Sequence, residues 1–146
     1  KKIILVPHEV DKKNIKRITN QLNNLSIDFS LFTKEGLDLS KQVLLIDTVG
    51  LLSSLYSLGS HAYVGGGFKR GVHSVLEPAA HGCIISCGPN IEMLDEAKLL
   101  HKKNHLVIIN HNDDLLKFIN MDYESYQYLE TIKNIPSEMI NLLTND

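Results

Sequence analysis

The chain has 146 residues, enough to bury one hydrophobic core, and 43% of them are hydrophobic while 22% are charged. That composition is ordinary for a globular protein and excludes disordered and fibrous folds. Lys and Arg number 15 against 17 Asp and Glu, so the net charge of -2 gives no reason to expect a nucleic-acid partner. No apolar stretch approaches the ~20 residues that cross a bilayer and no signal-peptide layout is present, so we expect a soluble, cytoplasmic domain.

Six short apolar runs recur along the chain and predict buried strands. Each run is continuous rather than alternating, which is typical of parallel strands that are covered on both faces. Cys83 and Cys87 lie at the fifth run with a spacing too long for a disulfide within a strand, so we expect two reduced, buried thiols. The predicted strands are residues 3–6, 29–32, 43–46, 62–64, 83–85 and 106–109.

Helical patterns separate most of these runs. The first has Asp11 as its expected N-cap and places Ile15, Ile18 and Leu22 on one face, away from several basic residues. The segment of residues 33–42 is too short for a helical crossover, so a loop or short turn is expected there. Further helices are predicted at residues 51–58, 75–81, 93–100, 115–119, 123–132 and 136–143.

This alternation of strands and helices predicts the fold class. We expect an α/β protein with a Rossmann-like open parallel sheet and helices on both faces. No internal repeat or low-complexity linker divides the chain, so a single domain over residues 1–146 is expected.

The most informative segment is residues 64–78, which reads VGGGFKRGVHSVLEP and joins a predicted strand to a predicted helix. Its glycines are therefore expected at the carboxyl edge of the sheet, where open α/β folds bind ligands. Exposed backbone N–H groups and the following helix N-terminus suit a phosphate, and Lys69 and Arg70 can supply countercharge. The Glu77 carboxylate can accept hydrogen bonds from a ribose diol.

A purely structural interpretation of the same segment stays open. Triple glycine can serve only a tight turn, Ser74 and Glu77 fit a capping box, and His73 can simply brace the loop. Two familiar nucleotide motifs are disfavoured. Val72 and His73 stand where a P-loop needs Lys and Ser or Thr, and the first βα turn, residues 7–11, has no glycine for a dinucleotide fingerprint.

Three other turns follow predicted strands and are expected at the same edge of the sheet. Each is a weak signal by itself, because Asp47 and Thr48 can merely cap the next helix and Gly88 and Pro89 can merely turn the chain. These turns are residues 7–9, 47–50 and 88–90.

Together these segments resemble the C-terminal domain of 3-deoxy-D-manno-octulosonic acid (Kdo) transferase. The resemblance spans residues 7–100 and rests on IDTVGLL at residues 46–52, the glycine-rich segment of residues 64–78, Gly82, and GPN at residues 88–90. It implies the second half of a GT-B glycosyltransferase that binds CMP-Kdo and needs no metal or other cofactor. The family transfers Kdo to a lipid A precursor in lipopolysaccharide biosynthesis, at the cytoplasmic face of the bacterial inner membrane.

The resemblance also implies roles for particular residues. Pro7 and His8 are expected near the phosphate of CMP, and Glu77 is expected at the ribose. The backbone of Val49, Gly50 and Leu51 is expected near the cytosine. The residues expected to shape the rest of the donor pocket are Gly66, Gly67, Gly71, His73 and Ser74.

Three of these positions depart from the common pattern of the family. His8, Leu51 and Ser74 stand where Arg, Glu and Asn are usual, and we interpret this as divergence of a lineage rather than loss of function. The general base of the family lies in an N-terminal domain, which also carries the membrane-associated acceptor site. We therefore expect a fragment of a longer enzyme, with no catalytic residue of its own and no transfer activity alone.

Two other functions are compatible with the same pattern. A different GT-B glycosyltransferase, using a UDP-sugar, would share the glycine loop and the ribose-binding Glu and would differ in base recognition. A non-catalytic module that only binds a nucleotide or a protein partner is the second, and failure to bind CMP would favour it.

Overall fold

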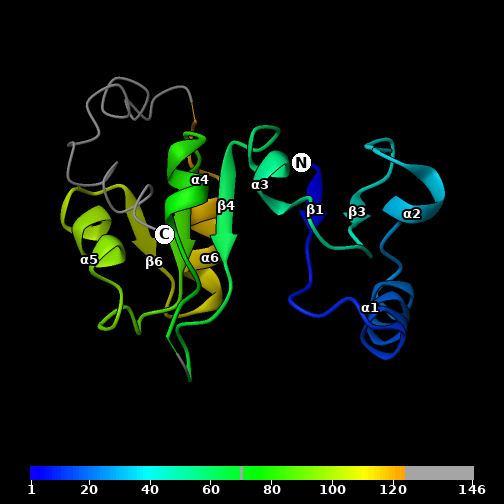
Figure 1. Ribbon diagram of the computed structural model, residues 1–146, viewed down its shortest axis with the longest axis horizontal. Helices are drawn as coiled ribbons and strands as arrows, with labels where there is room; N and C mark the ends of the chain where they lie inside the picture. The colour runs from blue at the N-terminus through cyan, green and yellow to red at the C-terminus, as the bar shows by residue number, and fades with distance from the viewer. Residues whose placement is uncertain (70, 124–146) are drawn as a thin grey trace. The chain divides into compact units, whose positions relative to one another are not determined.

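The computed structural model describes residues 1–69 and 71–123. It divides the chain into two compact units, unit 1 at Lys1–Leu52 and unit 2 at Ser53–Asp146, and each contains a three-stranded sheet (Figure 1). Arg70 and the helices predicted beyond residue 123 lie outside the described residues. The expectation of a single domain stays a prediction.

Unit 1 is built on three parallel strands in the order β1-β3-β2. All three residues of the central strand are buried, as its unbroken apolar sequence predicts. The strands are β1 at Ile3–Leu5, β2 at Phe29–Leu31 and β3 at Val43–Leu45.

The helix α1, Lys12–Asn24, connects β1 to β2 and confirms the predicted crossover. The carboxylate of Asp11 accepts hydrogen bonds from the backbone N–H groups of Lys13 at 2.8 Å and Asn14 at 3.0 Å, so it is the N-cap. Leu22 is buried on the opposite side of the helix from its basic residues.

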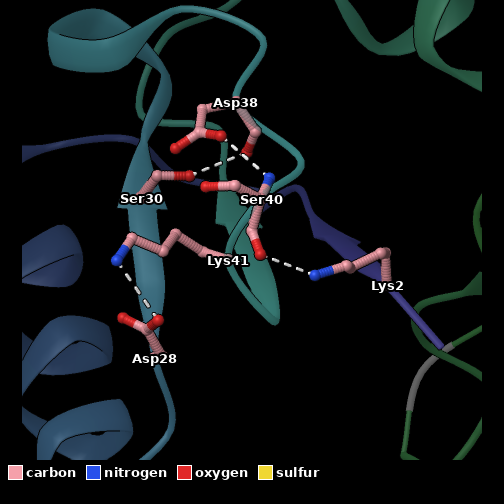
Figure 2. Close-up of polar contacts among 6 residues, drawn as sticks. All are labelled: Lys2, Asp28, Ser30, Asp38, Ser40 and Lys41. Carbon is pink, nitrogen blue, oxygen red and sulfur yellow. Dashed lines mark hydrogen bonds and ion pairs between the residues drawn. The ribbon is translucent and has the colours of Figure 1, made fainter.

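The connection from β2 to β3 is short, as predicted. It contains the single-turn helix α2, Phe32–Glu35, followed by Gly36 at a φ of 66°. Side chains then hold the remaining segment to the strands beside it (Figure 2). The hydroxyl of Ser30 donates to the carbonyl of Asp38 at 3.0 Å, the Asp38 carboxylate accepts from the Ser40 N–H at 2.8 Å, and the Lys2 ammonium donates to the Ser40 carbonyl at 2.7 Å.

Unit 2 contains three parallel strands in the order β4-β5-β6. All six strands predicted from the sequence are thereby confirmed, although the fifth runs two residues further than expected. Cys83 and Cys87 are both free and buried, which confirms the expectation for the thiols. The strands are β4 at His61–Val64, β5 at Ile84–Cys87 and β6 at Leu106–Ile108.

Helices cover both faces of the β4-β5-β6 sheet. On one face Ile85 and Cys87 pack against Ala79 of α4 and Ala97 of α5, and on the other Ile84 packs with Phe118 of α6. The predicted α/β fold class is confirmed. The helices are α3 at Leu52–Tyr56, α4 at Leu76–Ala80, α5 at Asp95–Lys102 and α6 at Asn112–Ile119.

The helix predicted at residues 93–100 begins two residues later, and Met93 does not share its buried face. Met93 is 87% exposed, whereas Ile91 before it is buried and the Leu94 N–H closes a turn on the Ile91 carbonyl at 3.0 Å. Asp95 and Glu96 then occupy the first turn of α5, where the helix dipole favours negative charge.

Among the described residues, no helix is long and apolar enough to cross a bilayer.

Candidate functional site

The loops that follow β4 and β5 meet backbone to backbone. Gly67 has a φ of 81°, and a Cβ added to it would lie 2.8 Å from the backbone of Gly88. A Cβ on Gly88 would lie 2.7 Å from the carbonyl oxygen of Gly66, and the Asn90 N–H donates to the Gly67 carbonyl at 2.8 Å. The structural interpretation of the glycines therefore holds for Gly67, because the neighbouring loop excludes any side chain there.

Gly66 has a structural role as well. Its φ is 93°, an added Cβ would lie 2.7 Å from the carbonyl oxygen of Gly71, and it forms an antiparallel bridge with Val72. The His73 N–H also donates to the Gly65 carbonyl at 3.3 Å. The loop thus folds back on itself, with Val72 buried beneath it and His73 at its exposed side.

Gly71 differs from the glycines before it. Apart from Gly71 itself and its chain neighbours, no heavy atom of the described residues lies within 4 Å of a Cβ added to Gly71. The fold of the described residues therefore accommodates a side chain at this exposed position. A ligand that approaches the backbone closely would account for glycine here.

Glu77 lies in the first turn of α4 with its side chain exposed. The capping box that the structural interpretation offered for Ser74 and Glu77 does not form: the N-cap is Val75, and the Ser74 hydroxyl accepts a long hydrogen bond, 3.4 Å, from the Leu76 N–H. No hydrogen bond to the Glu77 carboxylate is recorded within the described part of the chain. Glu77 thus places a negative charge at the positive end of a short helix.

Tyr56, at the end of α3, is a neighbour of Glu77 that the sequence reasoning missed. Burial raises the pKa of the Tyr56 hydroxyl, and the negative charge of Glu77 raises it further. The Tyr56 ring also lies 6.4 Å from that of His81, measured between centroids. Residues 51–58 carry only a helical pattern in sequence, and a lone Tyr at its end gives no signal of this proximity.

The other predicted donor-binding residues lie in unit 1 and follow two adjacent strands. Pro7 and His8 come after β1, and Val49, Gly50 and Leu51 come after β3. The two strands stay paired up to this edge, where the Ile46 N–H donates to the Leu5 carbonyl at 3.0 Å. Val49 is 77% exposed, and Gly50 has a φ of 87°, which favours glycine in this turn.

Asp47 does not cap the following helix, which was one expectation for it. Its carboxylate accepts hydrogen bonds from the backbone N–H of Thr33 at 2.9 Å and from the Thr33 hydroxyl at 2.5 Å. Asp47 thereby joins the turn after β3 to α2. Each of its two carboxylate oxygens accepts a hydrogen bond from Thr33.

The structure brings the predicted residues together in two sets, each at the carboxyl edge of its own sheet. One set, in unit 1, comprises Pro7, His8, Val49, Gly50 and Leu51, and the other, in unit 2, comprises Gly66, Gly67, Gly71, His73, Ser74 and Glu77. Among residues 1–69 and 71–123, no group of three or more His, Cys, Asp or Glu side chains could hold a metal ion.

Parallel strands under helices, with a glycine-rich loop and an exposed carboxylate at the carboxyl edge, define the class of α/β domains that bind ligands at that edge. No family model matches the chain. Proteins of similar sequence are Kdo transferases, which confirms the resemblance seen in the sequence. In fold the chain is similar to the C-terminal CMP-Kdo binding domain of WaaA from Acinetobacter baumannii, with a TM-score of 0.71, 19% identity, and coverage of 97% of this chain and 72% of that one.

The sequence similarity covers different shares of the chain in different relatives. The enzyme of Chlamydia muridarum is 36% identical over 92 residues, which cover 62% of this chain and 21% of the relative. The enzyme of Chlamydophila psittaci is 31% identical over 93 residues, with the same coverage, 62% and 21%. The enzyme of Rickettsia bellii is 26% identical over 159 residues, which cover 97% of this chain and 37% of the relative. The chain thus spans well under half the length of these relatives.

Proposed function

We propose that the chain is the donor-binding part of a glycosyltransferase that transfers Kdo from CMP-Kdo to a lipid A precursor. The observation that carries the proposal is Gly71, an exposed glycine whose added Cβ would meet open space, in the same glycine-rich segment as the exposed Glu77. The similarity to Kdo transferases supports the choice of CMP-Kdo as the donor over other sugar nucleotides.

In the proposed reaction the acceptor hydroxyl attacks the anomeric carbon of Kdo and gives up its proton to a general base. The bond from that carbon to the CMP phosphate breaks, and its electron pair leaves with the phosphate oxygen. The part of this chain is to bind CMP and to stabilise the departing negative charge with N–H groups and cations such as Lys69. The Glu77 carboxylate binds the ribose hydroxyls and thereby orients the donor.

We place the other functions of a GT-B enzyme outside these residues. The general base, the acceptor site and the contact of that site with the inner membrane belong in this proposal to an N-terminal domain. The chain alone is then expected to bind the donor without transferring it.

The test is calorimetric titration of the chain with CMP, CMP-Kdo, UDP and UDP-N-acetylglucosamine. We expect CMP and CMP-Kdo to bind in preference to the UDP compounds. Glu77→Ala should weaken CMP binding about tenfold or more, because it removes an acceptor of charge-assisted hydrogen bonds. Gly71→Ala should also weaken it while leaving the melting temperature unchanged.

Glu96→Ala is the matched control, because Glu96 is the second residue of α5 as Glu77 is of α4. It should leave CMP binding unchanged. A preference for UDP would move the chain to another GT-B enzyme. Absence of nucleotide binding by the folded chain would favour the non-catalytic module, and an equal loss in the Glu96 variant would contradict the role of Glu77.

A further inference from the structure

The exposed side of α1 carries a cluster of four cations. Lys12, Lys13, Lys16 and Arg17 are all exposed, and the helix contains no acidic residue. At 100° per residue the four side chains span an arc of about 140° on the side away from the buried Leu22. We call this surface the cationic face of α1.

The position of the cationic face opposes the stability of the helix itself. The four cations lie in its first two turns, at the positive end of the helix dipole, where cations are unfavourable. Its last turn, where they would be favourable, has no basic residue. The charge pattern therefore does not stabilise α1. Charges placed against the preference of a helix occur mainly at functional surfaces.

Within residues 1–69 and 71–123, the structure describes no ion pair of the cationic face. The ion pairs that the structure describes are Lys41 with Asp28 and Lys98 with Asp95, and neither involves α1. The nearby carboxylate of Asp11 is engaged as the N-cap. Arg17 donates hydrogen bonds to the side chains of Asn14 and Gln21, which are neutral acceptors, so its positive charge remains.

Positive charge is concentrated in this half of the chain. Unit 1 has eight Lys and Arg against six Asp and Glu, whereas the residues of unit 2 have seven against eleven. The cationic face alone holds half of the basic residues of unit 1. A partner recognised by charge would therefore meet this face of unit 1 first.

We propose that the cationic face of α1 binds the surface of an anionic lipid bilayer. Such a surface presents many phosphate groups in one plane, which complements several ammonium groups spread over one helix face. The contact is electrostatic and peripheral, because the apolar side of α1 is turned toward the core of unit 1. Lysine suits a diffuse charged surface, whereas specific bidentate phosphate recognition favours arginine.

This inference goes beyond the proposed function and does not depend on the donor. It is tested by co-sedimentation of the 146-residue chain with vesicles of phosphatidylcholine alone or with phosphatidylglycerol in equal parts. The test variant combines Lys12→Gln, Lys13→Gln and Lys16→Gln. The matched control combines Lys98→Gln, Lys102→Gln and Lys103→Gln, which removes the same charge from exposed positions at α5.

We expect the native chain to bind only the anionic vesicles and to dissociate as salt rises. The α1 variant should partition roughly a hundredfold more weakly, from the loss of three lysines near a charged surface, while the α5 variant stays within about twofold of the native chain.

Three outcomes would overturn the inference. They are absence of binding to anionic vesicles, equal loss in the α5 variant, and tighter binding of the cationic face to heparin or duplex DNA than to vesicles. A circular dichroism spectrum of the α1 variant tests whether it is folded, and titration with CMP tests whether its donor site is intact. If the α1 variant lost CMP binding with its spectrum unchanged, the lysines would belong to the donor site and the inference would fail.

Discussion

Gly67 and Gly88 belong to different loops but are constrained by the same contact. Each would place an added Cβ within 2.8 Å of the backbone of the other loop, a distance that backbone atoms cannot relieve by a rotamer change. Gly67 also has a positive φ, so a side chain there is strained in two ways. These glycines are explained by the protein alone, whereas Gly71 in the same segment is not.

Gly67→Ala should therefore lower the free energy of unfolding by more than about 2 kcal/mol, from backbone strain and the clash with Gly88. Urea denaturation followed by circular dichroism measures this change. Gly71→Ala is the control and should stay within about 0.5 kcal/mol of the native chain, since its Cβ meets open space. Equal stability of the two variants would mean that the loops do not pack as the structure describes.

Helix α6 begins with a carboxylate that was not singled out in the sequence. The Asp114 carboxylate accepts hydrogen bonds from the N–H groups of Asn110 at 3.0 Å and His111 at 3.1 Å. These backbone donors, in that order, lower the pKa of Asp114 below its usual 3.8. The ionised carboxylate thus joins the end of β6 to the first turn of α6.

The lowered pKa of Asp114 sets the direction of a pH effect on stability. When folding lowers the pKa of a carboxyl group, the ionised group stabilises the fold at pH values above its unfolded-state pKa. This stabilisation is lost as the pH falls through the folded-state pKa. Asp114→Asn should therefore be less stable than the native chain at neutral pH, and the difference should shrink below pH 3.8. Urea titrations at several pH values measure it.

Asp113→Asn is the control for this prediction, because Asp113 lies in the same turn and also carries a negative charge near the helix N-terminus. It should change stability less than Asp114→Asn at neutral pH, since within residues 1–69 and 71–123 no backbone N–H group is described as donating to its carboxylate. A difference between native chain and Asp114→Asn that did not vary with pH would contradict the role of the ionised carboxylate.

The reactivity of the two thiols measures whether unit 2 is folded. Cys87 lies in the hydrophobic cluster with Val75 and Ala97, and the Cys83 thiol donates to the Tyr56 carbonyl at 3.4 Å. Burial raises the pKa of each thiol to about 11. In the folded chain little of either thiol is therefore ionised to the reactive thiolate at neutral pH, and burial keeps a reagent from reaching it.

We expect neither thiol to react rapidly with a disulfide reagent at neutral pH until unit 2 opens. The reaction rate should rise with urea in parallel with the loss of helical signal, since opening supplies the exposed thiol. Single Cys83→Ser and Cys87→Ser variants assign the reaction to one position. Rapid reaction of either thiol in the folded chain would show that β5 is less protected than its burial indicates.

The sequence by itself determined the strands and the fold class. Continuous apolar runs such as residues 43–46 and 83–85 indicate strands that are covered on both faces, and the Asp11 cap follows from local hydrogen bonding. These elements could be predicted because hydrophobic patterns and helix caps involve residues that are close in the chain. The start of α5 was misplaced because Ile91, rather than Met93, is buried.

Only the tertiary structure decided which glycines of residues 64–78 the packing of the loops requires. The contact of Gly67 with Gly88, the bonds from Thr33 to Asp47, and the position of Tyr56 beside Glu77 join segments from different elements. No spacing along the chain encodes such contacts, because they arise when parallel strands bring the loops at their carboxyl ends together.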